Sequence, residues 1–141
     1  QQHRWEAILA LQKLLPDEAV KHWAAYAAQP QLPLEKAKEA FGNLREAFSK
    51  TQEGAGSPHV QQGFSTLLEL GSNENNPALL RLAAADTLEA LDQIKEANAI
   101  YYVLQNDSKV DRRVRRRATQ AVSRLSRVLL ANRPSAAPPT G

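Results

Sequence analysis

Arginine is the residue type whose spacing in this chain points most clearly to chemistry. Six arginines cluster near the C-terminal end of the sequence, at Arg112, Arg113, Arg116, Arg117, Arg124 and Arg127. At about 100° per residue, the rotation of an α-helix, all six fall within an arc of about 140°. A guanidinium group is planar and can bind a carboxylate or a phosphate through two parallel hydrogen bonds. The spacing therefore predicts an anion-binding helix face, the arginine face.

The other side of the same segment is apolar, which predicts one amphipathic helix over about 110–131. Its apolar residues are Val114, Ala118, Ala121, Val122, Leu125, Val128 and Leu129, with Arg115 at the border. This side is expected to pack into the body of the domain. The alternative to an anion-binding face is a solvated surface that carboxylates of neighbouring helices neutralise. The candidates for that role are Glu69, Glu74, Asp86, Glu89, Asp92, Glu96 and Asp107.

The charge is distributed unevenly along the chain, although the net charge is only +3. Residues 109–141 carry nine Lys and Arg against the single acidic residue Asp111, whereas residues 1–108 carry nine against fourteen. We therefore expect an acidic protein surface as the partner. Nucleic acid is the alternative, because the same arginines can contact phosphates. No aromatic residue interleaves with them to stack on bases, which argues against nucleic acid.

Side chains that could support catalysis or bind a metal are scattered. His3, His22 and His59 fall on different predicted elements, and Glu18 lies one helical turn before His22 without a third ligand for a metal. The chain has no Cys, no Gly-x-Ser-x-Gly motif and no phosphate-binding loop. We therefore expect no catalytic residue, no metal and no cofactor, and thus a non-enzymatic protein.

The elements that position these residues are predicted to be helices throughout. Pro16, Pro33, Pro58 and Pro77 each suit the first position of a helix, where a missing N–H costs nothing. Helical periodicity places segments at about 3–15, from 16 to a break at 29–33, 34–50, 57–71, 77–91, 93–105 and 110–131. No segment alternates polar and apolar residues with period two, so we predict an all-α fold of six or seven helices.

The aromatic residues indicate where the core lies. Core spacing is found for Trp5, Trp23, Phe41, Phe48, Phe64 and Tyr101. Tyr102 falls outside the apolar arc of its helix and is a candidate for an exposed contact residue. The segment 77–91 is apolar around most of its circumference, so we expect the fifth helix to be the most buried. Glu53–Gly56 is expected to be a flexible loop, and Gly71 a helix stop.

The fifth and seventh helices match each other weakly at a constant offset in residue number. The match aligns Arg81 with Arg115, Ala84 with Ala118, Leu88 with Val122 and Leu91 with Leu125, an offset of 34. With Pro77 and Asp111 as helix starts, this pattern resembles the second helix of the HEAT-type repeat over about 57–130. The resemblance implies stacked antiparallel pairs, the fourth helix with the fifth and the sixth with the seventh. Helices two and three have an offset nearer 47, which departs from a regular repeat and leaves an irregular bundle as the alternative.

The overall organisation follows from length and composition. We predict one helical domain over 1–131 and a disordered Pro/Ala-rich tail over 132–141. No apolar run approaches the ~20 residues of a membrane span. Without Met at position 1, the sequence is expected to begin inside a longer or processed chain, and the compartment stays open. The predicted function is an adaptor or assembly module, with a homo-oligomer as a further alternative.

Overall fold

The computed structural model describes residues 2–132, and these residues form helices without any strand. The all-α prediction is therefore confirmed, with the upper of the two expected helix numbers. The α-helices of the described segment are α1 (Gln2–Leu14), α2 (Pro16–Ala27), α3 (Leu34–Ser49), α4 (Pro58–Ser72), α5 (Ala78–Ala90), α6 (Ile94–Gln105) and α7 (Arg112–Ala131).

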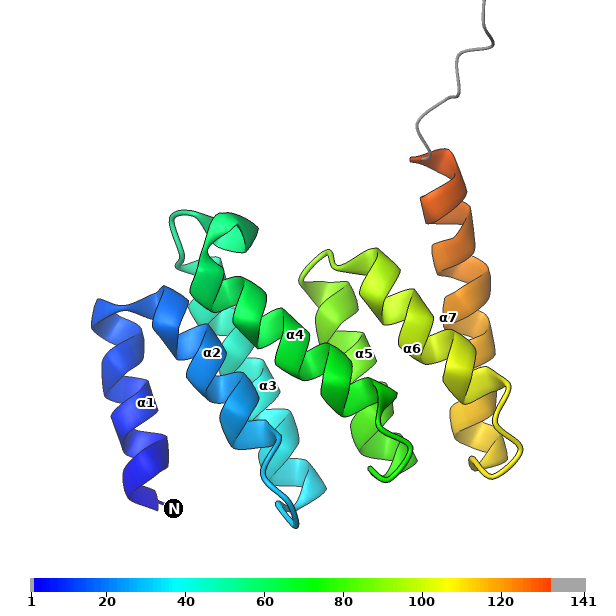
Figure 1. Cartoon of the computed structure of the whole chain (residues 1–141), viewed down its shortest axis with the longest axis horizontal. Coiled ribbons are helices and arrows are strands. Elements are labelled where there is room, and N and C mark those ends of the chain that lie inside the picture. Colours follow the sequence, from blue (N-terminus) through cyan, green and yellow to red (C-terminus); the bar gives the residue numbers. More distant parts are fainter. Residues whose placement is uncertain (1, 133–141) are drawn as a thin grey trace, which may run out of the picture.

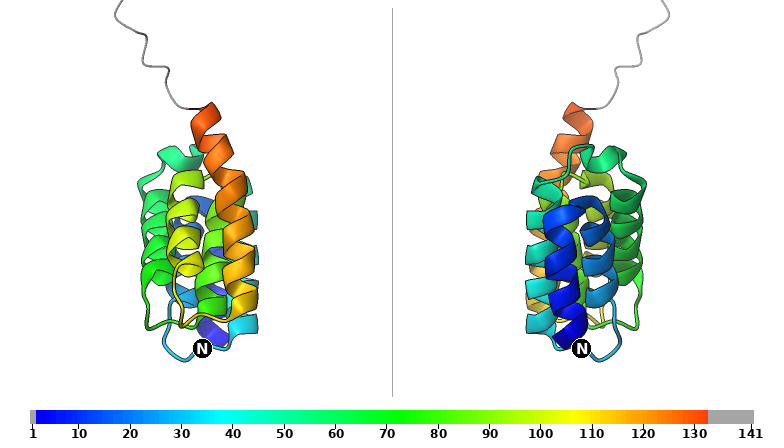
Figure 2. Two further views of the ribbon diagram at one scale, coloured as in Figure 1. Left: turned by 90° about the vertical axis from the view of Figure 1, so that its right-hand side faces the viewer. Right: turned by 90° about the vertical axis from the view of Figure 1, so that its left-hand side faces the viewer.

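The helices are arranged as a two-layer stack. Helices α2, α4 and α6 lie side by side in one layer, and α3, α5 and α7 lie in the other (Figures 1 and 2). Consecutive helices pair across the layers, α2 with α3, α4 with α5 and α6 with α7. Helices α5 and α6 pack on each other as well, so packing does not by itself divide the second half into the two pairs that the repeat implies. Helix α1 packs on α2 at one end of the stack, and the last turns of α7 extend beyond the other helices (Figure 1).

The helices of the second layer begin in the same way. Pro33, Pro77 and Asp111 precede α3, α5 and α7 with nearly identical backbone angles, φ −57° and ψ 141° for both prolines and φ −51° and ψ 139° for Asp111. Pro33 and Pro77 thus stand just before the first helical position, and not at it as predicted. Pro16 and Pro58 do occupy the first turn. Extended φ and ψ are the usual geometry of a residue that caps a helix.

The loops that lead into α5 and α7 have the same pattern of hydrogen bonds. The side-chain Oδ1 of Asn73 accepts from the backbone N–H of Asn75, and that of Asp107 accepts from Lys109, each at 2.9 Å. The carbonyl oxygens of Asn73 and Asp107 accept from the residue three positions on, each at 3.1 Å. A short Asx side chain favours this turn because it can replace a backbone acceptor. Asn73 and Asp107 are 34 residues apart, the same offset that aligns the residues of the fifth and seventh helices. The two loops therefore match in hydrogen bonding where the two helices match in sequence.

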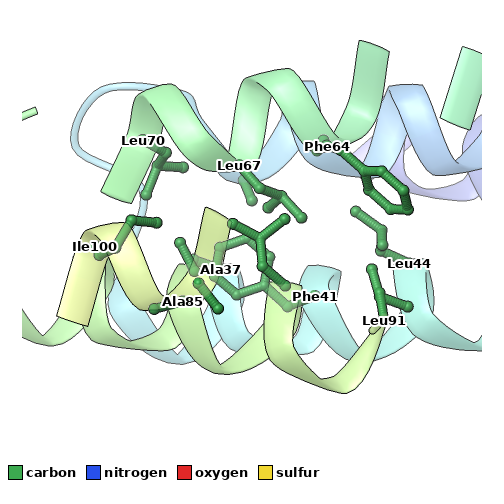
Figure 3. Packing of buried hydrophobic residues seen from close by; sticks show 14 of the residues in the cluster. Ala37, Phe41, Leu44, Phe64, Leu67, Leu70, Ala85, Leu91 and Ile100 are labelled. Carbon is green, nitrogen blue, oxygen red and sulfur yellow. The ribbon is translucent and has the colours of Figure 1, made fainter. Parts of the chain in front are cut away.

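The core lies between the two layers and continues along the stack. Side chains from α3, α4, α5 and α6 meet there, among them Phe41, Leu67 and Ile100 (Figure 3). Of the six aromatic residues expected in the core, all are buried except Phe48, which is half-buried. Ala40, Ala84 and Ala118 are fully buried. Small side chains at these positions let neighbouring helices approach closely.

Helix α2, rather than α5, is the most buried element. No residue of α2 is exposed, whereas α5 exposes Leu79 and Ala90. The prediction for α5 was wrong because α1 covers the side of α2 that would otherwise face solvent. The indole Nε1 of Trp23 in α2 donates to Oε1 of the buried Gln12 in α1 at 3.0 Å. This bond satisfies two polar groups that would be costly to bury alone.

Two glycines have roles other than those the sequence suggested. Gly71 lies inside α4, which ends at Ser72, and a Cβ at Gly71 would overlap the side chain of Ile100 in α6. Close approach of α6, and not a helix stop, therefore requires glycine there. Gly54 adopts φ +55° at the start of a short 3₁₀ helix, Gly54–Gly56, within the segment expected to be a flexible loop. A positive φ costs glycine little because it has no Cβ.

The predicted domain boundary falls at the end of α7. Asn132 closes this helix and is the last described residue, so nearly all of the predicted 132–141 tail lies outside the described residues. Among the helices of residues 2–132, none is long and apolar enough to cross a membrane.

Candidate functional site: the arginine face of α7

Helix α7 is amphipathic, as its sequence predicts. Its buried residues are Val114, Ala118, Ala121 and Leu125. All six residues of the arginine face are exposed, and Arg115 at the border is half-buried. The carboxylate of Asp111 begins the helix by accepting from the backbone N–H of Arg113 at 2.7 Å. A carboxylate at this end also favours the helix electrostatically.

Two members of the arginine face are bound to carboxylates of α5. Arg124 donates through Nη2 to both carboxylate oxygens of Glu89, at 2.7 Å each, and Arg117 donates to Asp86 Oδ2 at 3.3 Å. The hydrogen bond from Arg124 to Glu89 raises the pKa of Arg124. For these two arginines, the alternative of neutralisation by neighbouring carboxylates is the correct one.

The same two carboxylates accept from the buried Tyr101 of α6. Its hydroxyl lies within hydrogen-bonding distance of Asp86 and, at 3.0 Å, of Glu89. Burial raises the pKa of Tyr101, and the hydrogen bond to Asp86 raises it further. The phenol therefore stays a protonated donor. Because Tyr101 donates from α6, Asp86 and Glu89 join α5, α6 and α7 in one polar network.

The other members of the arginine face lack such a partner. Within residues 2–132, no carboxylate forms an ion pair with the four unpaired arginines, Arg112, Arg113, Arg116 and Arg127. Arg112 and Arg116 lie one turn apart, where like charges repel by about 0.2–0.5 kcal/mol. Since all four side chains are exposed, an external anion can reach them.

Tyr102 is the predicted partner-binding residue that lies outside α7. It is 57% exposed, as predicted, but it belongs to α6 in the other layer of the stack. Its carbonyl oxygen accepts from the side chain of Asn106 at 2.9 Å. In the part of the chain that the structure describes, no hydrogen bond or cation–π contact links Tyr102 to an arginine of α7.

An apolar cleft that was not predicted from the sequence lies beside the arginine face. It has a volume of about 440 Å³, and it opens where α3, α5 and α7 begin. Its lining consists of Leu32, Leu34, Pro77, Ala78, Leu79, Leu80, Asp111, Arg113 and Val114. Leu79 is 52% exposed. The signal available in the sequence was the position of Leu79 outside the buried arc of its helix.

The histidine and carboxylate noted in the sequence, His22 and Glu18, lie one turn apart in α2, as predicted. Glu18 pairs with His59 of α4, with 3.5 Å between Oε1 and Nε2, instead of with His22. Burial, together with the charge of Lys21, lowers the pKa of His22. Over residues 2–132, no group of three or more His, Cys, Asp and Glu side chains is arranged to hold a metal ion.

Arg81, which the sequence aligns with Arg115, has a structural role in α5. This side chain is 2% exposed, and its Nε donates to the carbonyl oxygen of Gly71 at the end of α4, at 2.9 Å. A cation at the C-terminal end of a helix satisfies carbonyl groups that have no partner within the helix. Arg81 therefore joins α4 to α5 through Nε, while its buried Nη2 has no hydrogen-bond partner within the described residues.

Fold and site together define a two-layer helical stack whose final helix carries exposed cations next to an apolar cleft. Comparison of the chain with protein-family models, with curated proteins and with solved structures gave no match.

Proposed function

We propose that this protein is a non-catalytic adaptor or assembly module that binds an acidic partner protein through the arginine face of α7. The observation that carries the proposal is the set of four unpaired arginines, which are exposed and have no ion-pair partner within residues 2–132. Their mutual repulsion opposes folding, and nearby carboxylates neutralise only Arg117 and Arg124. An acidic surface would relieve that repulsion and could accept paired hydrogen bonds from each guanidinium group.

We also propose that the stack is of the HEAT type. Support comes from the antiparallel pairs α4 with α5 and α6 with α7, and from the turns at Asn73 and Asp107, whose hydrogen bonds match at the same offset as the helices that follow them. Each pair of such a stack buries its apolar side against its neighbours. Stacks of this kind leave long surfaces for partners, in agreement with a binding role.

Affinity capture with charge-matched variants tests the proposed surface. One variant carries Arg112→Glu and Arg116→Glu, and the control carries Lys13→Glu and Lys95→Glu, which are exposed lysines of α1 and α6. Both variants change the net charge equally. We expect acidic partners captured by the wild type to be lost from the arginine variant and retained by the control. Equal retention by both variants would show that the arginine face is not the binding surface.

Nucleic acid is the alternative ligand, supported by the same four unpaired arginines. About four phosphate contacts would give a slope near −3.6 in a plot of log affinity against log salt concentration, since each contributes roughly −0.9. The exposed aromatic residue Tyr102 belongs to α6, and α7 itself carries no aromatic residue that could stack on a base between its arginines. We expect no RNA or DNA binding at low salt, and tight binding with that slope would replace the proposal.

A further inference from the structure

We infer that the apolar cleft and the adjoining arginines form one binding surface for a linear acidic segment carrying a large apolar side chain. This inference rests on the proposed function and specifies the partner: a short peptide whose carboxylates contact α7 and whose leucine-like anchor enters the cleft. Neither feature alone defines this ligand. The cleft supplies the apolar contact, and the arginines determine the charge of the residues around it.

The cleft has the size and lining of a binding pocket for an apolar group. Its volume of about 440 Å³ lies within the range of roughly 300–1,000 Å³ that is common for ligand pockets. Leu32, Leu34 and Leu79 present aliphatic groups from two different helices and the segment before one of them. Leu79 leaves about half of its surface in water. An anchor that covers it would therefore gain apolar burial without any change of the fold.

The charge beside the cleft favours an acidic occupant. Arg113 belongs both to the lining and to the unpaired arginines, and Arg116 follows at about 4.5 Å along the helix axis. The acidic residue of the lining is Asp111, whose carboxylate already accepts from the N–H of Arg113. A peptide carboxylate next to the anchor would thus be attracted by Arg113 and Arg116. The carboxylate of Asp111 would oppose it less, because it is already hydrogen-bonded to the N–H of Arg113.

The helix ends at the cleft add to this preference. Helices α3 and α5 begin there behind Pro33 and Pro77, and neither start has a side-chain cap. The carbonyl of Pro77 accepts from the N–H groups of Leu80 and Arg81. The N–H groups that have no acceptor among the described residues are therefore those of Ala78 and Leu79, two residues of the cleft lining. Such N–H groups carry the positive end of the helix dipole. They reinforce the attraction of the arginines for carboxylates.

A second copy of the chain fits this surface less well. A symmetric dimer brings the same patch of both subunits together, so the unpaired arginines of one copy would face those of the other. That arrangement would concentrate positive charge at the interface. A separate acidic segment avoids this cost.

Fluorescence anisotropy with three labelled peptides tests the inference on the whole chain. The first is a twelve-residue peptide with two leucines among glutamates; the second replaces both leucines with alanine, and the third replaces the glutamates with glutamine. We expect the first peptide to bind at least tenfold more tightly than either of the others. Comparable affinity of the first two peptides would overturn the cleft while leaving the arginine surface, and so the proposed function, in place.

Two leucine variants locate the anchor. Leu79→Asp places a charge in the cleft, and Leu14→Asp makes the same change at an exposed leucine of α1, at the other end of the stack. Both leucines are exposed, so both variants should fold, which circular dichroism checks. We expect Leu79→Asp to weaken binding of the first peptide at least tenfold and that of the alanine peptide, which has no anchor to lose, by less; Leu14→Asp should change neither. Equal effects of the two variants would refute the assignment.

Two further outcomes separate this inference from its alternatives. If the Arg112→Glu, Arg116→Glu variant binds the first peptide as well as the wild type does, the proposed function fails together with the inference. Sedimentation at two concentrations tests the second copy. A dimer that Leu79→Asp dissociates would assign the cleft to self-association and exclude the peptide.

Discussion

Two neighbouring tyrosines show how differently the fold uses one residue type. Tyr101 is buried, and its hydroxyl lies between the carboxylates of Asp86 and Glu89, whereas Tyr102 is exposed in the next position. Tyr101 falls on the apolar arc of its helix and Tyr102 falls outside it, so the sequence predicted burial for the first and exposure for the second. The sequence did not indicate that Tyr101 would hold two carboxylates that in turn bind arginines of α7.

Replacing each tyrosine with phenylalanine separates these roles. Tyr101→Phe removes the donor to Asp86 and Glu89 and leaves the two carboxylates without it, so we expect a loss of about 1 kcal/mol in the free energy of unfolding. Tyr102→Phe is expected to change it by less than about 0.5 kcal/mol. Urea denaturation followed by circular dichroism measures both. Equal losses would mean that the hydroxyl network contributes nothing specific.

The six arginines of α7 also divide into two kinds at this scale. Arg117 and Arg124 fasten α7 to α5, and the four unpaired arginines remain for a ligand. Surface ion pairs contribute little, with a median of about 0–1 kcal/mol. The two pairs therefore add little to stability, and their main consequence is that Arg117 and Arg124 are already occupied by carboxylates, so variants that test binding should leave them intact.

At the scale of the helices, close packing determines where glycine is needed. A Cβ at Gly71 would collide with Ile100, while a Cβ at Gly42, inside α3, would meet no heavy atom within 4 Å. Both glycines lie within helices, so backbone preference alone does not distinguish them. Only the distance between α4 and α6 does.

Alanine at these two glycines should have opposite effects. Gly71→Ala forces α4 and α6 apart or displaces Ile100, and we expect it to lower the free energy of unfolding by about 1–3 kcal/mol. Gly42→Ala removes the helix penalty of glycine and should raise it by about 0.5–1 kcal/mol. Thermal denaturation of both variants and the wild type provides the comparison. A stabilised Gly71→Ala variant would contradict the close packing of α4 on α6.

Considered over all described residues, 2–132, the stack has a neighbour on only one side of each end helix. Helix α5 packs on α3, α4, α6 and α7, whereas α1 packs mainly on α2 and the last turns of α7 extend past their neighbours (Figure 1). The interior helices thus share their burial with neighbours on two sides. The end helices do not.

This arrangement predicts a gradient of local stability. Amide hydrogen exchange should be slowest in α2, α4 and α5, which open only when the stack unfolds, and fastest among helical amides in α1 and in residues 126–131. Exchange measured by mass spectrometry on peptides of the native protein tests the gradient. Uniform protection from α1 to the end of α7 would indicate a single cooperative unit instead.

The helices, the aromatic core and the two sides of α7 could all be predicted from the amino-acid sequence. These features depend on residues a few positions apart, and the 3.6-residue period of a helix is enough to assign them to a face. The match between the fifth and seventh helices was also visible in the sequence. The turns at Asn73 and Asp107 repeat the same hydrogen bonds at the same offset of 34 residues.

Three features depend on how the helices pack and could not be predicted from the sequence: which arginines of α7 are neutralised, the close contact of Gly71 with α6, and the cleft beside Arg113. Asp86 and Arg117 are 31 residues apart, Glu89 and Arg124 are 35 apart, and the cleft joins the starts of three helices. Periodicity determines which side of a helix faces inward. It does not determine which residue of a neighbouring helix that side meets, because this depends on the separation and relative shift of helices packed together in the stack.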